Sequence, residues 1–238
     1  ITAAELNSSE NWEPQNYNEK FSGPVRLREG LAKSKNLVAI RVLKHIGPKY
    51  AQDYVSRFGF DPKKHQPYLS MALGVGEVTA MEMVSAYSVF ANGGYLKKPY
   101  FIEKIIDSKG RKVKLSSALM NAEVPRIIDP RNAFIMTDML KEVINTGTAR
   151  KAKRLKRSDI AGKTGTTNNL IDAWFAGYNP DIVTVTWMGF PQPKPLGNKE
   201  TGSRAALPIW IDYMEPILED YPVKMLVEPE GILPLKVK

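Results

Sequence analysis

The sequence predicts an α+β fold. A mostly helical lobe is expected over residues 1–95, and a lobe with an antiparallel sheet and flanking helices over residues 96–238. In the first lobe, apolar residues recur at helical spacing between Gly and Pro breakers. In the second, three short runs rich in β-forming residues are separated by short connections, which favours an antiparallel meander.

The first lobe is predicted to contain four helices. The segment Leu37–Ile46 is apolar on nearly all sides, so it is expected to be a buried helix. The last of the four begins at Thr79, because Glu82 lies three residues later and completes a capping box. The expected helices span residues 27–32, 37–46, 48–58 and 79–91.

The second lobe is predicted to begin with a hairpin, Tyr100–Ile106 and Arg111–Leu115 around an Asp-Ser-Lys-Gly turn. A helix capped by Asp129 follows and stops at Gly147. The closing helix carries an apolar stripe at helical spacing, and it can lie across one face of the sheet. The three expected strands span residues 160–167, 173–178 and 182–190, and the closing helix spans 207–218.

Composition excludes several kinds of site. The 238 residues contain no cysteine, so neither a disulfide nor a thiolate metal site is possible. The two histidines, His45 and His65, have no partner at metal-ligand spacing, and no metal or other cofactor is expected. The net charge is +9, and part of it lies in a basic run between Ala149 and Ser158. We interpret this run as a solvated lead-in to a strand, although binding of an anionic polymer stays open.

The run Gly162-Lys163-Thr164 fits two kinds of site. A phosphate-binding loop requires a glycine five residues before the Gly-Lys pair and a helix after it. Here that position is Arg157, and Thr166-Thr167 lead into a turn between strands. The alternative is the Lys-Thr-Gly strand of penicillin-recognising serine enzymes, which Lys163-Thr164-Gly165 resembles.

The chemistry of such a strand is consistent with these residue types. Gly165 allows a ligand to approach the backbone closely. The hydroxyls of Thr164 and Thr166 can bind a carboxylate, and Lys163 supplies positive charge. An exposed strand edge also pairs with an extended peptide through main-chain hydrogen bonds. We therefore predict a substrate-binding strand made of Thr164, Gly165, Thr166 and Thr167 beside a catalytic Lys163.

A second element, Ser34-Lys35-Asn36, lies between two predicted helices. It resembles the Ser-x-Asn element of the same enzymes. In those enzymes the serine hydroxyl relays a proton towards the leaving amine, and the asparagine amide holds the substrate backbone and the active-site lysine. The matching residues in this sequence are Ser34 and Asn36. The alternative is an ordinary turn with a Ser or Asn helix cap.

Longer stretches make the resemblance specific. They follow the order found in the transpeptidase domain of bifunctional, class A penicillin-binding proteins and cover nearly the whole chain. The resemblance implies the penicillin-binding transpeptidase and serine β-lactamase-like fold. The stretches are Trp12-Glu13-Pro14-Gln15-Asn16-Tyr17, Phe21-Ser22-Gly23-Pro24-Val25-Arg26-Leu27-Arg28-Glu29, Ala72-Leu73-Gly74, Ala86-Tyr87, Phe90-Ala91-Asn92-Gly93-Gly94, Asn145-Thr146-Gly147-Thr148-Ala149, Asp172-Ala173-Trp174-Phe175-Ala176-Gly177-Tyr178 and Ala205-Ala206-Leu207-Pro208-Ile209-Trp210.

This resemblance implies a mechanism and partners. A serine in a Ser-x-x-Lys element would attack a peptidoglycan stem peptide ending in D-Ala-D-Ala, and the acyl group would pass to a neighbouring amine. The backbone N–H of Thr166 would be one oxyanion donor. β-Lactam antibiotics would acylate the same serine. The implied location is the periplasmic face of the bacterial inner membrane, reached through an N-terminal anchor upstream, and no nucleic acid is expected as a partner.

The sequence departs from the family in one respect. No serine among the 238 residues is followed by a lysine three positions later. We therefore expect residues 1–238 to be the C-terminal part of a transpeptidase domain, with the nucleophile and any glycosyltransferase domain preceding Ile1. Two alternatives stay open: a D,D-carboxypeptidase or β-lactamase of the same superfamily, and a non-catalytic module that binds an anionic polymer.

Overall fold

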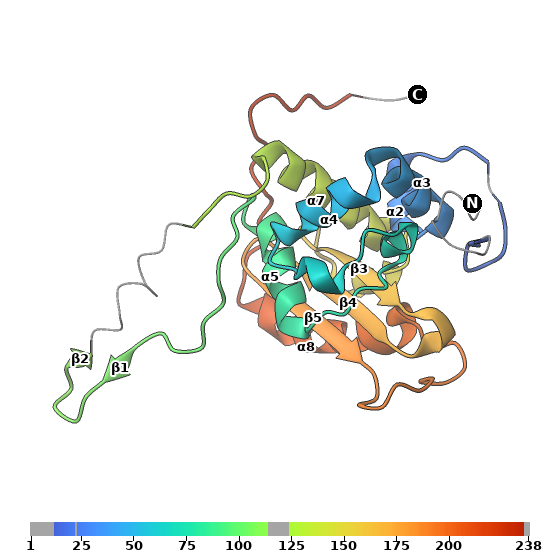
Figure 1. Cartoon of the computed structure of the whole chain (residues 1–238). Helices are drawn as coiled ribbons and strands as arrows, with labels where there is room; N and C mark the ends of the chain where they lie inside the picture. The colour runs from blue at the N-terminus through green and yellow to red at the C-terminus, as the bar shows by residue number, and fades with distance from the viewer. Residues whose placement is uncertain (1–11, 22, 114–123, 236–238) are drawn as a thin grey trace.

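The structure is a computed structural model that describes residues 12–21, 23–113 and 124–235. Its body consists of an antiparallel sheet between two helical layers, which confirms the predicted α+β class (Figure 1). Helix α8 (Leu207–Glu219) packs on one face of the sheet, and α5 (Ala80–Ala91) and α7 (Pro130–Asn145) pack on the other.

Side chains three positions apart on the central strand show these two faces. Phe175 packs edge-on against Trp210 of α8, with ring centroids 5.0 Å apart. Tyr178 contacts Tyr87 of α5, and its hydroxyl is 2.9 Å from that of Thr137 of α7. Because successive side chains of a strand alternate between faces, α8 and the α5–α7 pair lie on opposite sides.

The sheet is the predicted meander of three strands, β3 (Ala161–Thr166), β4 (Ala173–Tyr178) and β5 (Val183–Met188), in that order. Its register pairs Thr166 with Ala173 and Ala173 with Met188. Two short connections make this possible, one over residues 167–172 and one over residues 179–182. In the second, the Asn179 side chain accepts hydrogen bonds from the N–H groups of Asp181 and Ile182.

The α-helices within the first 95 residues begin at or within one residue of the predicted positions. They are α2 (Leu27–Ala32), α3 (Asn36–Ile46), α4 (Pro48–Ser56) and α5, with a short 3₁₀ helix at Leu69–Leu73. The predicted capping box of α5 is present, since Thr79 and Glu82 exchange hydrogen bonds between side chain and backbone. The division of the chain into two lobes at residue 95 stays a prediction.

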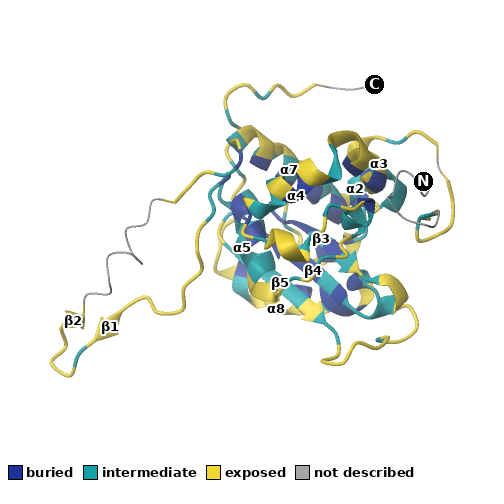
Figure 2. Cartoon of the chain, viewed as in Figure 1, coloured by how far each residue is buried: buried dark blue, intermediate teal, exposed yellow. Residues whose placement is uncertain are grey.

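The prediction that the helix over residues 37–46 is buried was wrong. Only Ile40 and Leu43 are buried, whereas the side chains of Val42 and Ile46 are exposed (Figure 2). The reason is that α3 packs mainly against Leu69–Leu73 and its neighbouring helices, which cover one face only. An apolar composition on all sides therefore does not bury a helix that lies in the outer layer.

The main hydrophobic core lies between the sheet and both helical layers (Figure 2). It joins residues from the whole length of the chain, so the early helices and the sheet share one interior. Within the described residues, no helix combines the length and the apolar character needed to cross a bilayer. The largest fully buried side chains of the molecule are Trp210, Tyr178, Phe175, Leu207, Ile211, Met214, Val89, Val143 and Asn179.

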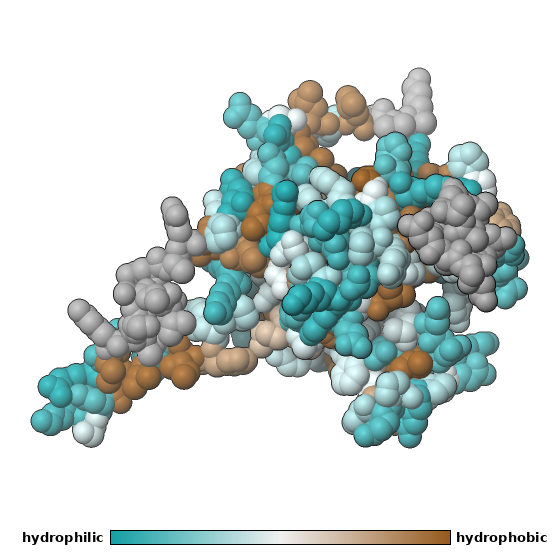
Figure 3. Space-filling view, in the orientation of Figure 1, coloured by the Kyte–Doolittle hydropathy of each residue, from teal (hydrophilic) through white to brown (hydrophobic). Residues whose placement is uncertain are grey.

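A long arm, which includes residues 96–113, projects from the body between α5 and α7 (Figure 1). At its base, Tyr95 pairs with Arg126, whose guanidinium stacks 4.4 Å from the centroid of the Tyr95 ring. The predicted hairpin is present but shorter than expected. It pairs only β1 (Ile105–Ile106) with β2 (Lys112–Val113). The predicted strand residues 100–104 form no strand, and residues 114 and 115 lie outside the described part of the chain. The arm exposes apolar side chains, seen as brown surface in Figure 3.

Part of the basic run is used inside the fold. Residues Arg150–Leu155 form a 3₁₀ helix, and Arg154 binds both Asp212 and Glu215 on α8. Arg157 forms an almost fully buried ion pair with Asp159. It also donates to three main-chain carbonyls, that of Leu218 in the last turn of α8 and those of Tyr221 and Pro222 just after the helix. The run is thus partly structural rather than a solvated lead-in alone.

Candidate functional site

Two motifs 129 residues apart in the sequence meet at one edge of the sheet. The Lys163 ammonium on β3 donates a 2.9 Å hydrogen bond to the hydroxyl of Ser34, in the turn between α2 and α3. It donates a second, also 2.9 Å, to the carbonyl of Thr164. Ser34 has a left-handed backbone, φ 51°, which is uncommon outside glycine. The turn therefore holds Ser34 in an unusual conformation that places its hydroxyl on Lys163.

The side chain of Lys163 is only partly exposed to water. Burial disfavours a charged amine, and it lowers the pKa of Lys163 to about 8. At neutral pH the group is still mostly protonated, so it carries positive charge and donates hydrogen bonds. A pKa near the working pH also suits a group that exchanges protons.

The third predicted catalytic residue, Asn36, has a different partner. Its side-chain amide donates to the main-chain carbonyl of Gln15 at 2.8 Å. The alternative was that Ser34 or Asn36 caps a helix. The structure does not show this, because the N-cap residue of α3 is Lys35 and its side chain makes no capping hydrogen bond. The structure thus brings Ser34 and Lys163 together, and it leaves the Asn36 amide on the segment that precedes α2.

The outer edge of β3 is available for pairing, since β4 is its only strand neighbour in the described chain. The N–H of Thr167 donates to the carbonyl of Asp172, so these two residues form a hydrogen-bonded pair. In antiparallel sheets such pairs alternate with non-bonded ones. The main-chain groups of Thr164 and Thr166 therefore point away from β4. The contact between the Lys163 ammonium and the Thr164 carbonyl agrees with this direction.

The three threonine hydroxyls of the predicted strand have different surroundings. The Thr164 hydroxyl is buried and lies 2.6 Å from the Thr148 hydroxyl. Thr166 is exposed, and its hydroxyl accepts the N–H of Gly202 at 3.0 Å. The Thr167 hydroxyl accepts the N–H of Asp172 at 2.7 Å and so closes the turn after β3. Of the three, Thr166 is the hydroxyl best placed to meet a ligand.

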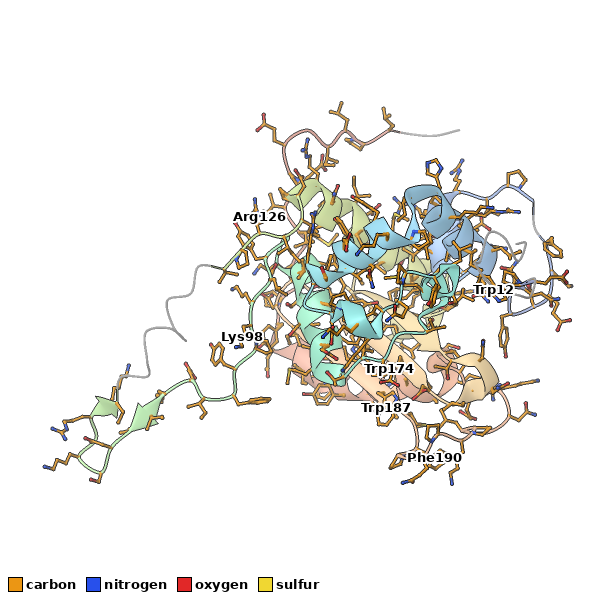
Figure 4. The ribbon with its side chains drawn as sticks, viewed as in Figure 1. Trp12, Lys98, Arg126, Trp174, Trp187 and Phe190 are labelled. Carbon is orange, nitrogen blue, oxygen red and sulfur yellow. The ribbon has the colours of Figure 1, made fainter. Side chains whose placement is uncertain are left out.

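Gly165 is favoured by packing as well as by access. A Cβ added there would lie 3.1 Å from the Cβ of Trp174, its partner on β4. Trp174 in turn contacts Trp187 of β5 (Figure 4). Trp187 is 44% exposed, and its indole N–H donates to Asp172 at 2.8 Å. This bond ties β5 to the turn that follows β3.

Two residues at the site belong to no catalytic motif in the sequence. Thr148 touches Thr164, and Gly202 touches Thr166, each from a segment distant in the chain. The only sequence signal for Thr148 is that it lies in the Asn-Thr-Gly-Thr-Ala stretch that resembles the family. Gly202 has no signal beyond its position shortly before α8, because a close backbone approach leaves no pattern of its own.

The structure argues against the phosphate-loop alternative. Gly162, Lys163 and Thr164 lie within a regular strand, so they form no loop around a phosphate. Among the described residues, no three His, Cys, Asp or Glu side chains are grouped so that they could hold a metal ion. The site is therefore organised around an amine, hydroxyls and a strand edge.

The structure is therefore an α+β domain with an antiparallel sheet between helices and with an amine and a hydroxyl in contact at the edge of its outer strand. Residues 2–215 match the family described as the penicillin binding protein transpeptidase domain. The chain therefore belongs to that family, which is a family of serine-type enzymes.

Individual proteins show the same relationship. The chain is 48% identical over 223 residues to penicillin-binding protein 1A of Neisseria lactamica, covering 93% of this chain and 28% of that protein. The crystal structure of penicillin-binding protein 1A from Haemophilus influenzae superposes with a TM-score of 0.90 at 34% identity, over 94% of this chain and 39% of that one. The PonA1 protein from Mycobacterium tuberculosis, in complex with penicillin V, shares the fold with a TM-score of 0.76 and 22% identity. That match covers 92% of this chain and 63% of PonA1.

Proposed function

We propose that this chain supplies the substrate strand and the proton relay of a peptidoglycan D,D-transpeptidase. The observation that carries the proposal is the hydrogen bond between Lys163 and Ser34, which joins the two family motifs at an open strand edge. Membership of the transpeptidase family supports the reaction class. The chain spans 28% of the length of the Neisseria lactamica relative, so the activity of the whole protein is part of this proposal.

The roles of the residues follow from their contacts. Thr166 would offer its outward N–H to the oxyanion of the tetrahedral intermediate and its hydroxyl to the substrate carboxylate. Lys163 would add positive charge beside that carboxylate. Because Ser34 accepts a hydrogen bond from Lys163, its own proton is free to pass to the leaving amine. Asn36 would bind the substrate backbone only after it releases Gln15.

The proposed reaction has two steps. A serine in a Ser-x-x-Lys element outside these 238 residues attacks the penultimate D-Ala carbonyl, so that a C–O bond forms and the C–N bond breaks. The terminal D-Ala leaves with the proton that Ser34 relays. The amine of a neighbouring stem peptide then attacks the ester, so that a C–N bond forms, the ester C–O bond breaks, and the proton lost by the amine returns to the serine oxygen. β-Lactams would enter the same first step.

The proposed partners and location follow from this reaction. Stem peptides ending in D-Ala-D-Ala and β-lactams would bind along β3, and the site would face the periplasm. The alternative of polymer binding through the basic run is less well supported, because Arg154 and Arg157 are already paired within the fold.

A labelling experiment tests the proposal. The full-length protein is incubated with a fluorescent penicillin and examined on a denaturing gel. We expect one covalent band that is lost in Lys163→Ala and Ser34→Ala and kept in Lys156→Ala, which removes an exposed lysine outside the site. A folded full-length protein that takes no label would refute the proposed function. Binding that instead falls steeply with salt would favour the anionic-polymer alternative.

A further inference from the structure

Thr148 contacts both segments that carry the catalytic motifs. Its backbone N–H donates to the carbonyl of Ala32 at 3.0 Å, two residues before Ser34. Its side-chain hydroxyl lies 2.6 Å from that of Thr164, the residue after Lys163. One residue therefore touches the chain beside each partner of the Ser34–Lys163 hydrogen bond.

These contacts close a ring. Starting at Thr148, the ring passes through Ala32 and Ser34, crosses to Lys163 by the 2.9 Å hydrogen bond, and reaches Thr164. It returns to Thr148 through the hydroxyl pair. The Lys163 ammonium also binds the Thr164 carbonyl, so the amine that contacts Ser34 is fixed to the residue that Thr148 holds. A change in the hydroxyl pair is therefore transmitted to the amine.

Thr148 is itself held in place. The N–H groups of Thr146 and Ala149, on either side, donate to the carbonyls of Glu142 and Val143 in the last turn of α7. Next to it, Gly147 packs so closely that an added Cβ would lie 2.1 Å from the Ala32 carbonyl oxygen. The end of α7 thus presents Thr148 to both motifs from a rigid support, which is what a site built on a scaffold requires.

We propose that Thr148 is a positioning residue for the acylation step, and that its hydroxyl sets the place of Lys163 relative to Ser34. The inference rests on the proposed function and adds a residue to it. Loss of the hydroxyl would leave Thr164 without its partner and allow the amine to shift. Shifts on the order of 1 Å in reacting groups can lower rates by about two orders of magnitude.

Variants of the full-length protein test this proposal. Thr148→Val keeps the shape and the backbone N–H but removes the hydroxyl, and Thr148→Ser restores it. The matched control is Thr137→Val, which breaks a similar pair of buried hydroxyls. This pair joins Thr137 of α7 to Tyr178 of β4, away from the Ser34–Lys163 contact. Stopped-flow acylation by a chromogenic β-lactam separates the first-order acylation constant from the dissociation constant, and the melting temperature reports structural damage.

We expect Thr148→Val to lower the first-order acylation constant about tenfold. Thr148→Ser and Thr137→Val should stay within about twofold of the unchanged protein. Thr164→Val should lose as much as Thr148→Val, and the double variant no more than either, because both remove one interaction. This pair keeps the test valid should Thr148→Val fold poorly.

Two results would contradict the proposal, and they differ from each other. If Thr148→Val acylates as fast as Thr137→Val while the unchanged protein labels normally, the positioning role is wrong and the proposed function stands. If the unchanged full-length protein is not acylated at all, both proposals fall together.

Discussion

At the scale of single residues, Lys163 decides what the site can do. Its side chain is only partly exposed, and its ammonium donates to Ser34 and to the Thr164 carbonyl. Burial lowers its pKa to about 8, which brings loss of the proton close to physiological pH. The positive charge proposed to face the substrate carboxylate is therefore present at pH 7 and decreases as the pH rises through 8.

This gives a prediction for the pH dependence of acylation. The second-order acylation constant of the full-length protein should be nearly level between pH 6 and pH 7, and it should fall as the pH rises through about 8. Lys163→Arg should react more slowly but lose this decline, because a guanidinium keeps its proton throughout the range. A decline with the same midpoint in Lys163→Arg would assign the titration to another group.

At the scale of elements, β3 is anchored where it begins. Asp159, just before the strand, is fully buried and pairs with Arg157, and it also accepts the N–H of Lys224. Burial raises the pKa of Asp159, but the hydrogen bonds and charge of Arg157 outweigh this effect, so the pKa lies below its usual value. A lowered carboxyl pKa stabilises the fold above the unfolded-state pKa, and that stability is lost as pH falls through the folded-state pKa.

The prediction concerns Asp159→Asn. It should lower the free energy of unfolding at pH 7 by about 3 kcal/mol, because it leaves a buried guanidinium without its partner. Because Asp159 in the unchanged protein becomes protonated in acid, the difference should shrink below about pH 4. Asp212→Asn breaks an exposed pair with Arg154 and should cost less than about 1 kcal/mol at either pH. Urea unfolding at pH 7 and pH 3.5 measures both, and equal losses for the two variants would contradict the buried-pair account.

At the scale of the whole molecule, a tightly packed body carries an arm that contributes little to the core (Figure 2). The sheet and its helices share one interior centred on Phe175 and Trp210. The arm, by contrast, leaves Phe101 89% exposed, and β1 and β2 pair at two positions in its described part. Stability should therefore be unevenly distributed between the two parts.

Paired substitutions of phenylalanine test this difference. Phe175→Ala should lower the free energy of unfolding by about 4 kcal/mol, because it empties a fully buried site. Phe101→Ser should change it by less than about 0.5 kcal/mol, since the ring already lies in water. Urea denaturation of both variants provides the comparison. A loss above about 2 kcal/mol for Phe101→Ser would show that the arm is part of the cooperative unit.

Elements with local signals could be predicted from the sequence. The capping box at Thr79, the Asp129 cap and the apolar stripe of α8 each depend on residues a few positions apart, and all three are present. The order of the three strands followed in the same way from their short connections. The meeting of Ser34 with Lys163 depended on the family resemblance, because no local pattern spans 129 residues.

Features that depend on tertiary neighbours could not be predicted. Helix α3 is apolar all round yet half exposed, because its burial depends on which elements cover it. Trp187 alternates like a core residue but lies at the surface, where its indole N–H has Asp172 as a partner. The bond between Asn36 and the Gln15 carbonyl and the bond between Thr148 and Thr164 are both long-range side-chain contacts, which leave no periodic signal.

The open edge of β3 also bears on self-association. An unpaired strand edge is a template onto which another copy can add, and proteins usually protect such edges with charge, proline or a covering segment. Here the edge must stay open if a peptide is to pair with it, so proline or a covering loop would defeat its use. The Lys163 ammonium already occupies the outward carbonyl of Thr164 and places a charge on the edge. The same lysine that is proposed to serve the reaction therefore also disfavours edge-to-edge stacking of identical copies.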